Sequence, residues 1–246
     1  MAKELIGLTP SVVVTSTNQV TETLRRETAT IPIVFAALAD PVGSGLVASL
    51  ARPGGNVTGF PLFAEDMGGK WLEFMKEIAP RAERVAFIFH PDAAPHRGLL
   101  RTAQSVAPSK SINLLAYPVH DASEIAAVIT SFASGGDGGP VAVTHAVTLS
   151  NRDLIIGLAM RYRLPTVFGE LIWAESGGLL SYGSDMGELF RGAASYVDLI
   201  LRGANPSELP VQMPTKFNLV INLKTARAIG LTVPLTLLAR ADEVIE

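Results

Sequence analysis

The amino-acid sequence predicts an α/β protein, with parallel β-sheets flanked by helices. Three observations lead to this prediction. Strand-like apolar runs alternate with amphipathic helical segments along most of the chain, which is typical of βαβ units. Most of the runs are solidly apolar instead of alternating, as expected of strands covered on both faces. The 246 residues are enough for one large domain or two smaller lobes.

The strand candidates are short runs rich in β-branched or aromatic residues. The third of them, "NVTGF", follows "ARPGG", so a proline and glycines interrupt the regular pattern there. We interpret "RPGG" as the stop of a preceding helix and "NVTGF" as a strand. The predicted strands span residues 11–17, 31–38, 56–60, 84–89, 112–119, 140–145, 165–169 and 177–183.

Helical segments fill the gaps between these strands. The start, "MAKELIGLTPS", reads as the tail of a helix, and "DMGGKWLEFMKEIAP" places Trp71 and Phe74 on one helix face. Asp121 with Glu124 three residues later resembles a capping box, and "MGELFRGAASYVDLILRG" ends at Gly203. Near the end we expect an extended piece, "LPVQMPTKFNLVIN", and two short helices, "LKTARAIG" and "PLTLLARADEVIE".

The composition excludes several classes of protein. Apolar residues make up 48% and charged residues 17%, so the chain is a folded globular protein. A net charge of −3 without a basic run argues against a nucleic-acid partner. There are no cysteines, which excludes disulfides, thiolate metal sites and cysteine nucleophiles. No apolar run approaches the ~20 residues of a membrane helix, and no signal peptide is recognisable at the N-terminus, so we expect no direct membrane insertion.

One glycine motif suggests an alternative function. The stretch from Gly43 to Ala48 has the form G-x-G-x-x-A after a predicted strand, with Glu65 about 20 residues on, as in dinucleotide-binding turns. An NAD(P)-dependent oxidoreductase is therefore one alternative. Asp40 would place a carboxylate near the pyrophosphate, and a glycine-assisted helix N-terminus explains the motif better.

The histidines do not have metal-ligand spacing, and no catalytic motif is present, so we expect no metal, no cofactor and no enzyme activity. His90 and His145 nevertheless share one property: each lies at the carboxyl end of a predicted parallel strand. Ligands bind at that edge of open α/β sheets, so these two histidines are candidates for lining a site.

Several long stretches resemble a known family. "DPVGSGLVASLARPGGNVTGF", "GGKWLEFMKEIAPRAERVAFIF", "GGLLSYGSDMGELFRGAASYVDLILRGANPSELPVQMPTKFNLVINLKTARAIGL" and "LLARADEVIE" are similar to the substrate-binding proteins of ABC transporters of the tryptophan-/branched-chain type. The resemblance runs from about residue 11 to the C-terminus. It implies a type 1 periplasmic-binding-protein fold, in which two hinged lobes capture a small solute.

The resemblance also implies a partner and a location. The solute would be an amino acid or a related carboxylate, passed to the membrane permease of an ABC importer in the periplasm. Family members begin with a signal peptide and further strands of lobe 1 that this sequence lacks. We therefore expect an N-terminally truncated chain, which as given would stay cytoplasmic. A ligand-sensing domain of a regulator has the same fold and is a further alternative.

The resemblance implies the following lobes and site. Residues 1–58 are the incomplete N-terminal part of lobe 1, residues 59–184 form lobe 2, and residues 185–246 return to lobe 1. The hinge residues are expected to be Thr58, Gly59, Asp185 and Thr215. In related amino-acid binders, lobe 1 holds the ligand carboxylate and an acidic side chain of lobe 2 holds the ammonium. We expect Thr17 and the 37–41 loop to serve the carboxylate, and Glu170 or Asp92 the ammonium. The candidate ligand-binding residues are Ser16, Thr17, Asn18, Ala37, Asp40 and Pro41 in lobe 1, and His90, Asp92, Thr144, His145, Phe168 and Glu170 in lobe 2.

Overall fold

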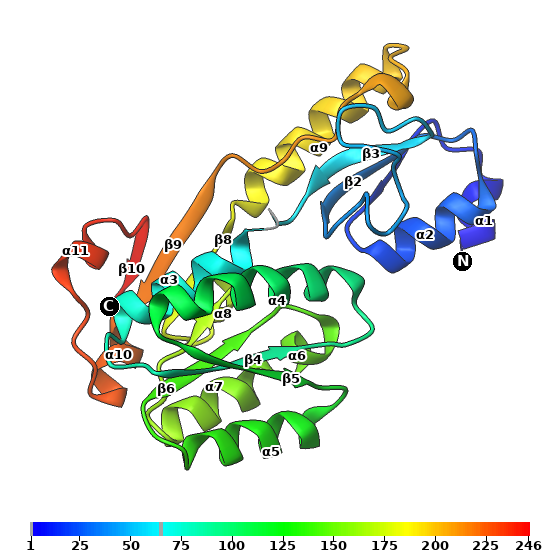
Figure 1. Cartoon of the computed structure of the whole chain (residues 1–246). Helices are drawn as coiled ribbons and strands as arrows, with labels where there is room; N and C mark the ends of the chain where they lie inside the picture. The colour runs from blue at the N-terminus through cyan, green and yellow to red at the C-terminus, as the bar shows by residue number, and fades with distance from the viewer. Residues whose placement is uncertain (1, 64–65) are drawn as a thin grey trace. The chain divides into compact units, whose positions relative to one another are not determined.

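The structure, a computed structural model, describes residues 2–63 and 66–246 and divides the chain into two compact units (Figure 1). Unit 1 comprises Met1–Ala64 and Ser184–Lys216, and unit 2 comprises Glu65–Gly183 and Phe217–Glu246. The chain therefore passes from one unit to the other three times. Each unit has its own parallel sheet and its own core, as the α/β prediction required.

Unit 1 is built on a three-stranded parallel sheet in the order β1-β2-β3. Its strands are β1 (Val13–Thr15), β2 (Ile33–Leu38) and β3 (Val57–Pro61). Its helices are α1 (Ala2–Gly7), α2 (Asn18–Glu27), α9 (Met186–Leu201) and the short 3-10 helix η2 (Pro206–Glu208). Alternate residues of β2 face opposite layers, because side chains of a strand point alternately to its two faces. Ile33 and Phe35 pack with Leu24 of α2, whereas Val34 and Ala36 pack with Tyr196 of α9.

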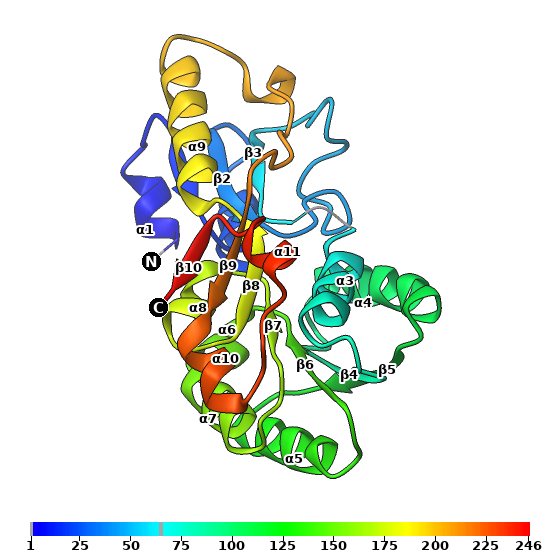
Figure 2. The same ribbon diagram turned by 90° about the vertical axis from the view of Figure 1, so that its left-hand side faces the viewer.

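Unit 2 is built on a seven-stranded sheet in the order β10-β9-β8-β7-β6-β4-β5, and the strand labels follow this order across Figure 2. The pairs β10–β9, β8–β7, β7–β6, β6–β4 and β4–β5 are parallel. The strands are β4 (Arg84–Phe89), β5 (Asn113–Pro118), β6 (Gly138–Ala142), β7 (Val167–Phe168), β8 (Leu180–Ser184), β9 (Phe217–Asn222) and β10 (Glu243–Ile245).

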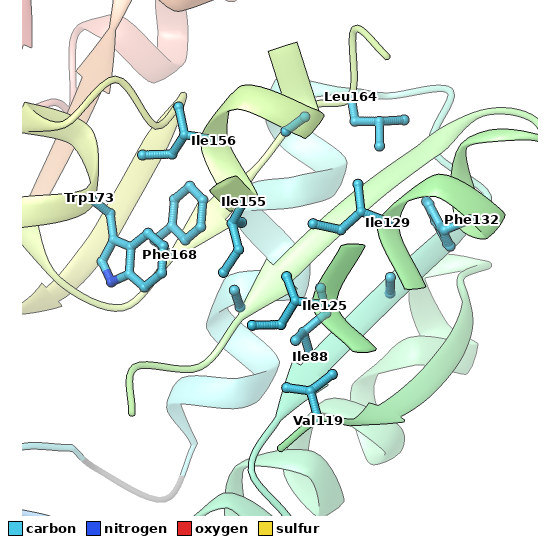
Figure 3. Close-up of a cluster of buried hydrophobic side chains, with 13 residues drawn as sticks. Ile88, Val119, Ile125, Ile129, Phe132, Ile155, Ile156, Leu164, Phe168 and Trp173 are labelled. Atoms are coloured by element: carbon cyan, nitrogen blue, oxygen red, sulfur yellow. The ribbon is translucent and has the colours of Figure 1, made fainter. Parts of the chain in front are cut away.

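Helices cover both faces of the unit 2 sheet (Figure 1). The helices are α3 (Met67–Ile78), α4 (Ala94–Val106), η1 (Ala107–Lys110), α5 (Ala122–Ala133), α6 (Ala146–Ser150), α7 (Arg152–Arg161), α8 (Leu171–Glu175), α10 (Leu223–Ile229) and α11 (Leu235–Leu238). On one face, Trp71 of α3 packs near Phe87 of β4. On the other face, α5, α7 and α8 enclose a cluster around Phe168 and Trp173, whose rings stack with centroids 4.4 Å apart (Figure 3). No helix among the described residues is both long and apolar enough to cross a membrane.

Three sequence predictions differ from the structure. The segment after Asp40 forms consecutive turns and no helix, because Asp40 and Gly45 have positive φ angles of 44° and 69°. Consequently "RPGG" does not end a helix. The stretch "PLTLLARADEVIE" forms the single turn α11 and then strand β10, since Asp242 accepts a hydrogen bond from the Leu219 backbone N–H and starts the pairing with β9.

The unit boundaries also fall elsewhere than the expected lobe boundaries. The structure groups Phe217–Glu246 with unit 2, because β9 and β10 extend the large sheet beyond β8. Thr58 and Gly59 lie inside β3, and the first boundary comes after residue 64. Asp185 and Thr215 each lie within two residues of a boundary. Glu65, which would complete the dinucleotide motif, lies outside the described residues.

Candidate functional site

A row of polar side chains follows the carboxyl ends of four neighbouring strands in unit 2. His120 follows β5, His90 follows β4, Thr144 and His145 follow β6, and Glu170 follows β7. Because these strands are parallel and adjacent, their carboxyl ends meet at one edge of the sheet. This is the edge at which open α/β sheets bind ligands. The order β5-β4-β6-β7 could not be read from the sequence, but it places His90, Thr144, His145 and Glu170 together as expected.

Four imidazoles gather at this edge, and we call His90, His96, His120 and His145 the histidine cluster. His90 stacks on His145 with ring centroids 4.1 Å apart and 27° between the planes. His120 meets His90 edge-on at 5.5 Å, and His96 meets His145 edge-on at 5.7 Å. Such offset and edge-on contacts are the arrangements that aromatic rings prefer.

Backbone hydrogen bonds fix two of these rings. Nδ1 of His96 accepts the His90 backbone N–H at 3.1 Å, and Nδ1 of His145 accepts the Val147 N–H as the N-cap of α6. Both Nδ1 atoms are therefore unprotonated. Among the described residues, the buried Nδ1 of His90 has no hydrogen-bond partner. Buried polar atoms without a partner are rare, so this nitrogen is an unusual feature of the edge.

Two members of the cluster, His96 and His145, favour their neutral forms. Burial and the neighbouring His145 and His90 lower the pKa of His96 to about 4, against hydrogen bonds that raise it. Burial also lowers the pKa of His145, with a smaller contribution from His90. Desolvation and like-charge repulsion both disfavour the imidazolium of these two rings.

Thr144, which precedes His145 in the chain, lies near Glu170. Its hydroxyl oxygen accepts the indole N–H of Trp173 at 3.1 Å. Burial raises the pKa of Glu170, and the nearby Thr144 hydroxyl opposes that rise by stabilising the carboxylate. Glu170 is thus a partly buried acid beside a hydroxyl group that favours its charged form.

The two other predicted residues of this unit lie differently. Asp92 is exposed in the turn after β4, between His90 and α4. Phe168 is fully buried and its ring packs against Trp173, so its side chain belongs to the packing beneath the edge (Figure 3). The sequence analysis weighed the histidines as metal ligands or strand-end residues and did not find the bond of His96 to the His90 backbone. The position of His96 in the first turn of α4 gave no signal for that contact.

The corresponding edge of unit 1 is formed by Ser16, Thr17 and Asn18 after β1 and by the 37–41 loop after β2. The side chain of Asn18 donates to the Ala39 carbonyl at 2.7 Å and accepts the Ala39 N–H at 3.2 Å. These two hydrogen bonds connect the 37–41 loop to the start of α2. The pairing between β2 and β3 shifts in register at Ala37, whose φ is 63°. Strained non-glycine backbone of this kind occurs at ligand sites more often than elsewhere.

The remaining predicted residues of unit 1 have local partners. Thr17 is the N-cap of α2 and accepts the Val20 N–H, while the exposed Ser16 precedes it. The Asp40 carboxylate accepts the Gly43 N–H at 2.7 Å, and Pro41 is buried, with its carbonyl accepting from Leu46. Asp40 therefore stabilises the turn that follows β2. These residues lie at one sheet edge, as the sequence analysis expected.

The Asn18 clamp leads to a first prediction. Asn18→Ala removes both side-chain bonds to Ala39, so we expect the 37–41 loop to exchange its amide hydrogens at least tenfold faster, since two hydrogen bonds contribute about 1 kcal/mol each. Hydrogen exchange followed by mass spectrometry measures this. Gln19→Ala, at an exposed position one residue further on, serves as the matched control. Equal exchange in Asn18→Ala and the wild-type chain would show that the amide does not hold the loop.

The described residues form neither a metal site nor a dinucleotide-binding turn. Within residues 2–63 and 66–246, no group of three or more acidic or histidine side chains is arranged to hold a metal ion. The Gly43–Ala48 stretch does not open a helix, so it lacks the helix N-terminus on which a dinucleotide pyrophosphate rests.

Comparison with known proteins decides the family. The model of the ABC transporter substrate binding protein family matches residues 1–245. The chain belongs to this family. It is 26% identical over 201 residues to a tyrosine-binding protein of Clostridioides difficile (strain R20291), a match that covers 82% of this chain. The chain spans 57% of the length of that curated relative.

Solved structures agree with the family assignment. A conserved domain protein from Vibrio cholerae superposes with a TM-score of 0.91 at 29% identity, covering 99% of this chain and 81% of that chain. An ABC domain in complex with L-Trp from Streptococcus pneumonia superposes with a TM-score of 0.89 at 24% identity, covering 100% and 82%. The fold is thus that of the type 1 binding proteins, as predicted. Members of a substrate-binding family are not enzymes, which confirms that part of the sequence analysis.

Proposed function

We propose that the chain captures an amino acid outside the cytoplasm and passes it to the permease of an ABC importer. The observation that carries this proposal is Glu170, a partly buried acid at the carboxyl edge of unit 2. The nearby Thr144 hydroxyl favours its charged form. A carboxylate with free acceptor positions suits an ammonium group, which brings three donors and the opposite charge.

The edge of unit 1 supports a site for the carboxylate group of the amino acid. Thr17 carries a hydroxyl there, and the clamped 37–41 loop presents backbone groups in strained conformations. We assign the amino-acid carboxylate to this edge, where hydroxyl and N–H donors can reach it. Acidic groups other than Asp40 are absent from residues 16–18 and 37–41, and Asp40 is engaged with Gly43.

The histidine cluster supports a ligand with a flat side chain. His145 stacks on His90, and burial lowers the pKa of His145, which favours its neutral form; a neutral ring face can pack on another ring without the desolvation cost of a charge. The relatives are consistent with this, because one is named as tyrosine-binding and another was crystallised with L-Trp. L-tyrosine and L-tryptophan are therefore the probes with which to begin.

We also propose that the chain bends where it crosses between the units. Asp185 and Lys216 flank two of the crossings and are joined by a salt bridge of 2.8 Å and by an Asp185 N–H to Lys216 carbonyl bond of 3.0 Å. Thr215 precedes Lys216 at the same place. Two crossings fastened to each other would bend together, which suits the domain closure that binding proteins use.

The test of the ammonium assignment is Glu170→Gln. The amide keeps the shape and the Thr144 contact but loses the negative charge, so we expect the affinity for L-tyrosine or L-tryptophan to fall by at least tenfold. The loss corresponds to one charged hydrogen bond of about 1.5–3 kcal/mol. Isothermal titration calorimetry measures the dissociation constant.

Glu83→Gln is the matched control, because Glu83 is exposed at the opposite, amino-terminal edge of the same sheet. It should bind like the wild-type chain. An unchanged affinity in Glu170→Gln would overturn the assignment of the ammonium to Glu170.

A further inference from the structure

Helix α9 has a second apolar face next to the one that packs on the unit 1 sheet. Its core face lies against β2 and β3 (Figure 1) and consists of Leu189, Ala193, Tyr196 and Ile200, all buried. A helix at the surface of a globular protein needs only this one apolar face, and the rest of its surface is expected to be polar. A second apolar face on α9 therefore needs an explanation.

The second face is formed by Phe190, Ala194, Val197 and Leu201, which we call the α9 stripe. Steps of four, three and four residues place these side chains in line along the helix, because an α-helix turns once every 3.6 residues. Phe190 is 45% exposed and Leu201 60% exposed, while Ala194 is exposed and Val197 half-buried. The same spacing defines the a and d positions through which two helices pack in a coiled coil. Large apolar side chains that line up on a surface indicate an interaction site.

Charged residues lie beside the α9 stripe on the flank that faces away from the core. Arg191 and Asp198 are both exposed there and occupy the same heptad position, e, one heptad apart. Arg191 lies 2.7 Å from the carboxylate of Glu188, and Arg202 lies 3.0 Å from the carboxylate of Asp198. The flank thus presents a cation beside the first half of the stripe and an anion beside the second half.

This order of charges favours one orientation of a partner helix. In a parallel pair, position e faces position g of the partner, and the g positions here are Ala193 and Ile200 of the core face. In an antiparallel pair of identical helices, position e faces position e, so Arg191 of each copy meets the partner's Asp198. One surface then supplies both members of each charge pair, and the pair forms twice about a twofold axis.

We propose that the α9 stripe is the contact between two copies of this chain, whose α9 helices pack antiparallel about a twofold axis between Ala194 and Val197. Phe190 of each copy packs against the partner's Leu201 at the two ends of the contact. Ala194 packs against the partner's Val197 in the middle, where smaller side chains allow the helices to approach each other closely. This inference concerns a surface of unit 1 alone and goes beyond the proposed capture of a solute.

The size of the contact predicts a weak dimer. Helix α9 has 16 residues, and four side chains in each copy bury less area than the ~1,200 Å² at which stable interfaces begin. Interfaces of standard size have dissociation constants from micromolar to picomolar, so we expect a constant on the order of tens of micromolar here. Salt should weaken the dimer, because the Arg191–Asp198 pairs lie at its solvent-exposed flank.

Sedimentation velocity over a range of concentrations tests the apolar part of the contact. The wild-type chain should pass from monomer to dimer, and Phe190→Glu or Leu201→Glu should raise the dissociation constant at least tenfold. Leu199→Glu is the matched control, since Leu199 is 43% exposed on the same helix but lies half a turn away from the α9 stripe. It should associate like the wild-type chain. Thermal unfolding followed by circular dichroism shows that each variant is folded.

Charge exchange tests the antiparallel arrangement. Arg191→Asp or Asp198→Arg alone brings like charges together twice in each dimer, so each should raise the dissociation constant roughly fivefold. The double variant restores opposite charges and should dimerise like the wild-type chain. Single charge variants that associate as well as the wild-type chain would overturn the antiparallel pairing.

Two results would overturn the contact itself. One is a wild-type chain that stays monomeric at ten times the expected dissociation constant, which would leave the α9 stripe to a different protein. The other is a Leu199→Glu variant that dissociates as strongly as Phe190→Glu, which would place the contact on another face of the helix. Neither measurement requires a bound solute, so both are independent of the assignment of Glu170.

Discussion

Lowering the pH from 7 to 4 should destabilise unit 2 by about 3 kcal/mol through His96 alone. The pKa of His96 is about 4 in the folded chain and 6.5 in an exposed histidine, so the unfolded chain binds the proton first as the pH falls. Stability rises with pH wherever the unfolded state holds more protons. The contribution of neutral His96 is therefore complete above pH 6.5, declines between pH 6.5 and 4, and is exhausted below pH 4. The size follows from 1.36 kcal/mol for each tenfold step in proton affinity.

The charged or chargeable groups around His96 disfavour its protonation. His145 and His90 face it from the ends of β6 and β4, and a charge on either would repel the imidazolium. The His90 N–H points at Nδ1, so protonation at that atom would break the bond. Among the described residues, the groups that shift the pKa of His96 include no carboxylate that could stabilise the charged ring. The acid transition of unit 2 should for this reason come earlier than the carboxylates alone would predict.

Urea denaturation at several pH values measures this effect. Both tryptophans of the chain, Trp71 and Trp173, are fully buried in unit 2, so their fluorescence reports the unfolding of that unit. In His96→Asn the amide oxygen can replace Nδ1 as acceptor, but the side chain no longer titrates. The variant should be less stable at pH 7 and should lose less stability than the wild-type chain between pH 6.5 and 4. Equal pH dependence in the two proteins would mean that His96 is not the group responsible.

The sequence predicted the secondary structure well where patterns were long and local. The run "RVAFIF" forms β4 over the predicted residues, and the Asp121 cap starts α5 as expected because both signals depend on neighbours in the chain. Predictions failed where distant segments decided the outcome. The last residues form β10 instead of a helix because β9, some twenty residues earlier, offers them a free sheet edge.

The position of the candidate residues along the sheet edge was predictable in part for the same reason. The rule that ligands bind at the carboxyl edge of parallel strands selected His90, Thr144, His145 and Glu170 from strand ends alone. It could not select Trp173, whose contact with Thr144 depends on how α8 packs against the sheet and spans 29 residues. It also could not separate Phe168, which is buried in the core, from the polar residues beside it. Strand ends locate an edge, whereas the direction of each side chain depends on packing.

Gly59→Ala should destabilise unit 1 by about 3 kcal/mol or more. Gly59 lies in the middle of β3, where a built Cβ would overlap the carbonyl oxygen of Phe35 on the neighbouring strand β2. Its φ of 149° is also strained for any residue with a side chain. Both strands are buried throughout this region, so the backbone can yield only by breaking the sheet. Overpacking and backbone strain each cost about 1–3 kcal/mol, and here they act at the same atom.

The sequence analysis assigned Gly59 to a hinge, and the stability of this variant separates that role from close strand packing. Tryptophan fluorescence does not report unit 1, so hydrogen exchange of β2 amides, followed by mass spectrometry, is the suitable measurement. Gly55→Ala is the matched control, since nothing among the described residues lies within 4 Å of a Cβ built there. We expect fast exchange across Ile33–Leu38 in Gly59→Ala and near wild-type protection in Gly55→Ala. If β2 kept its protection in Gly59→Ala, a flexible joint would explain the glycine better. Loss of protection would mean that the chain needs glycine there because two strands approach too closely for a side chain.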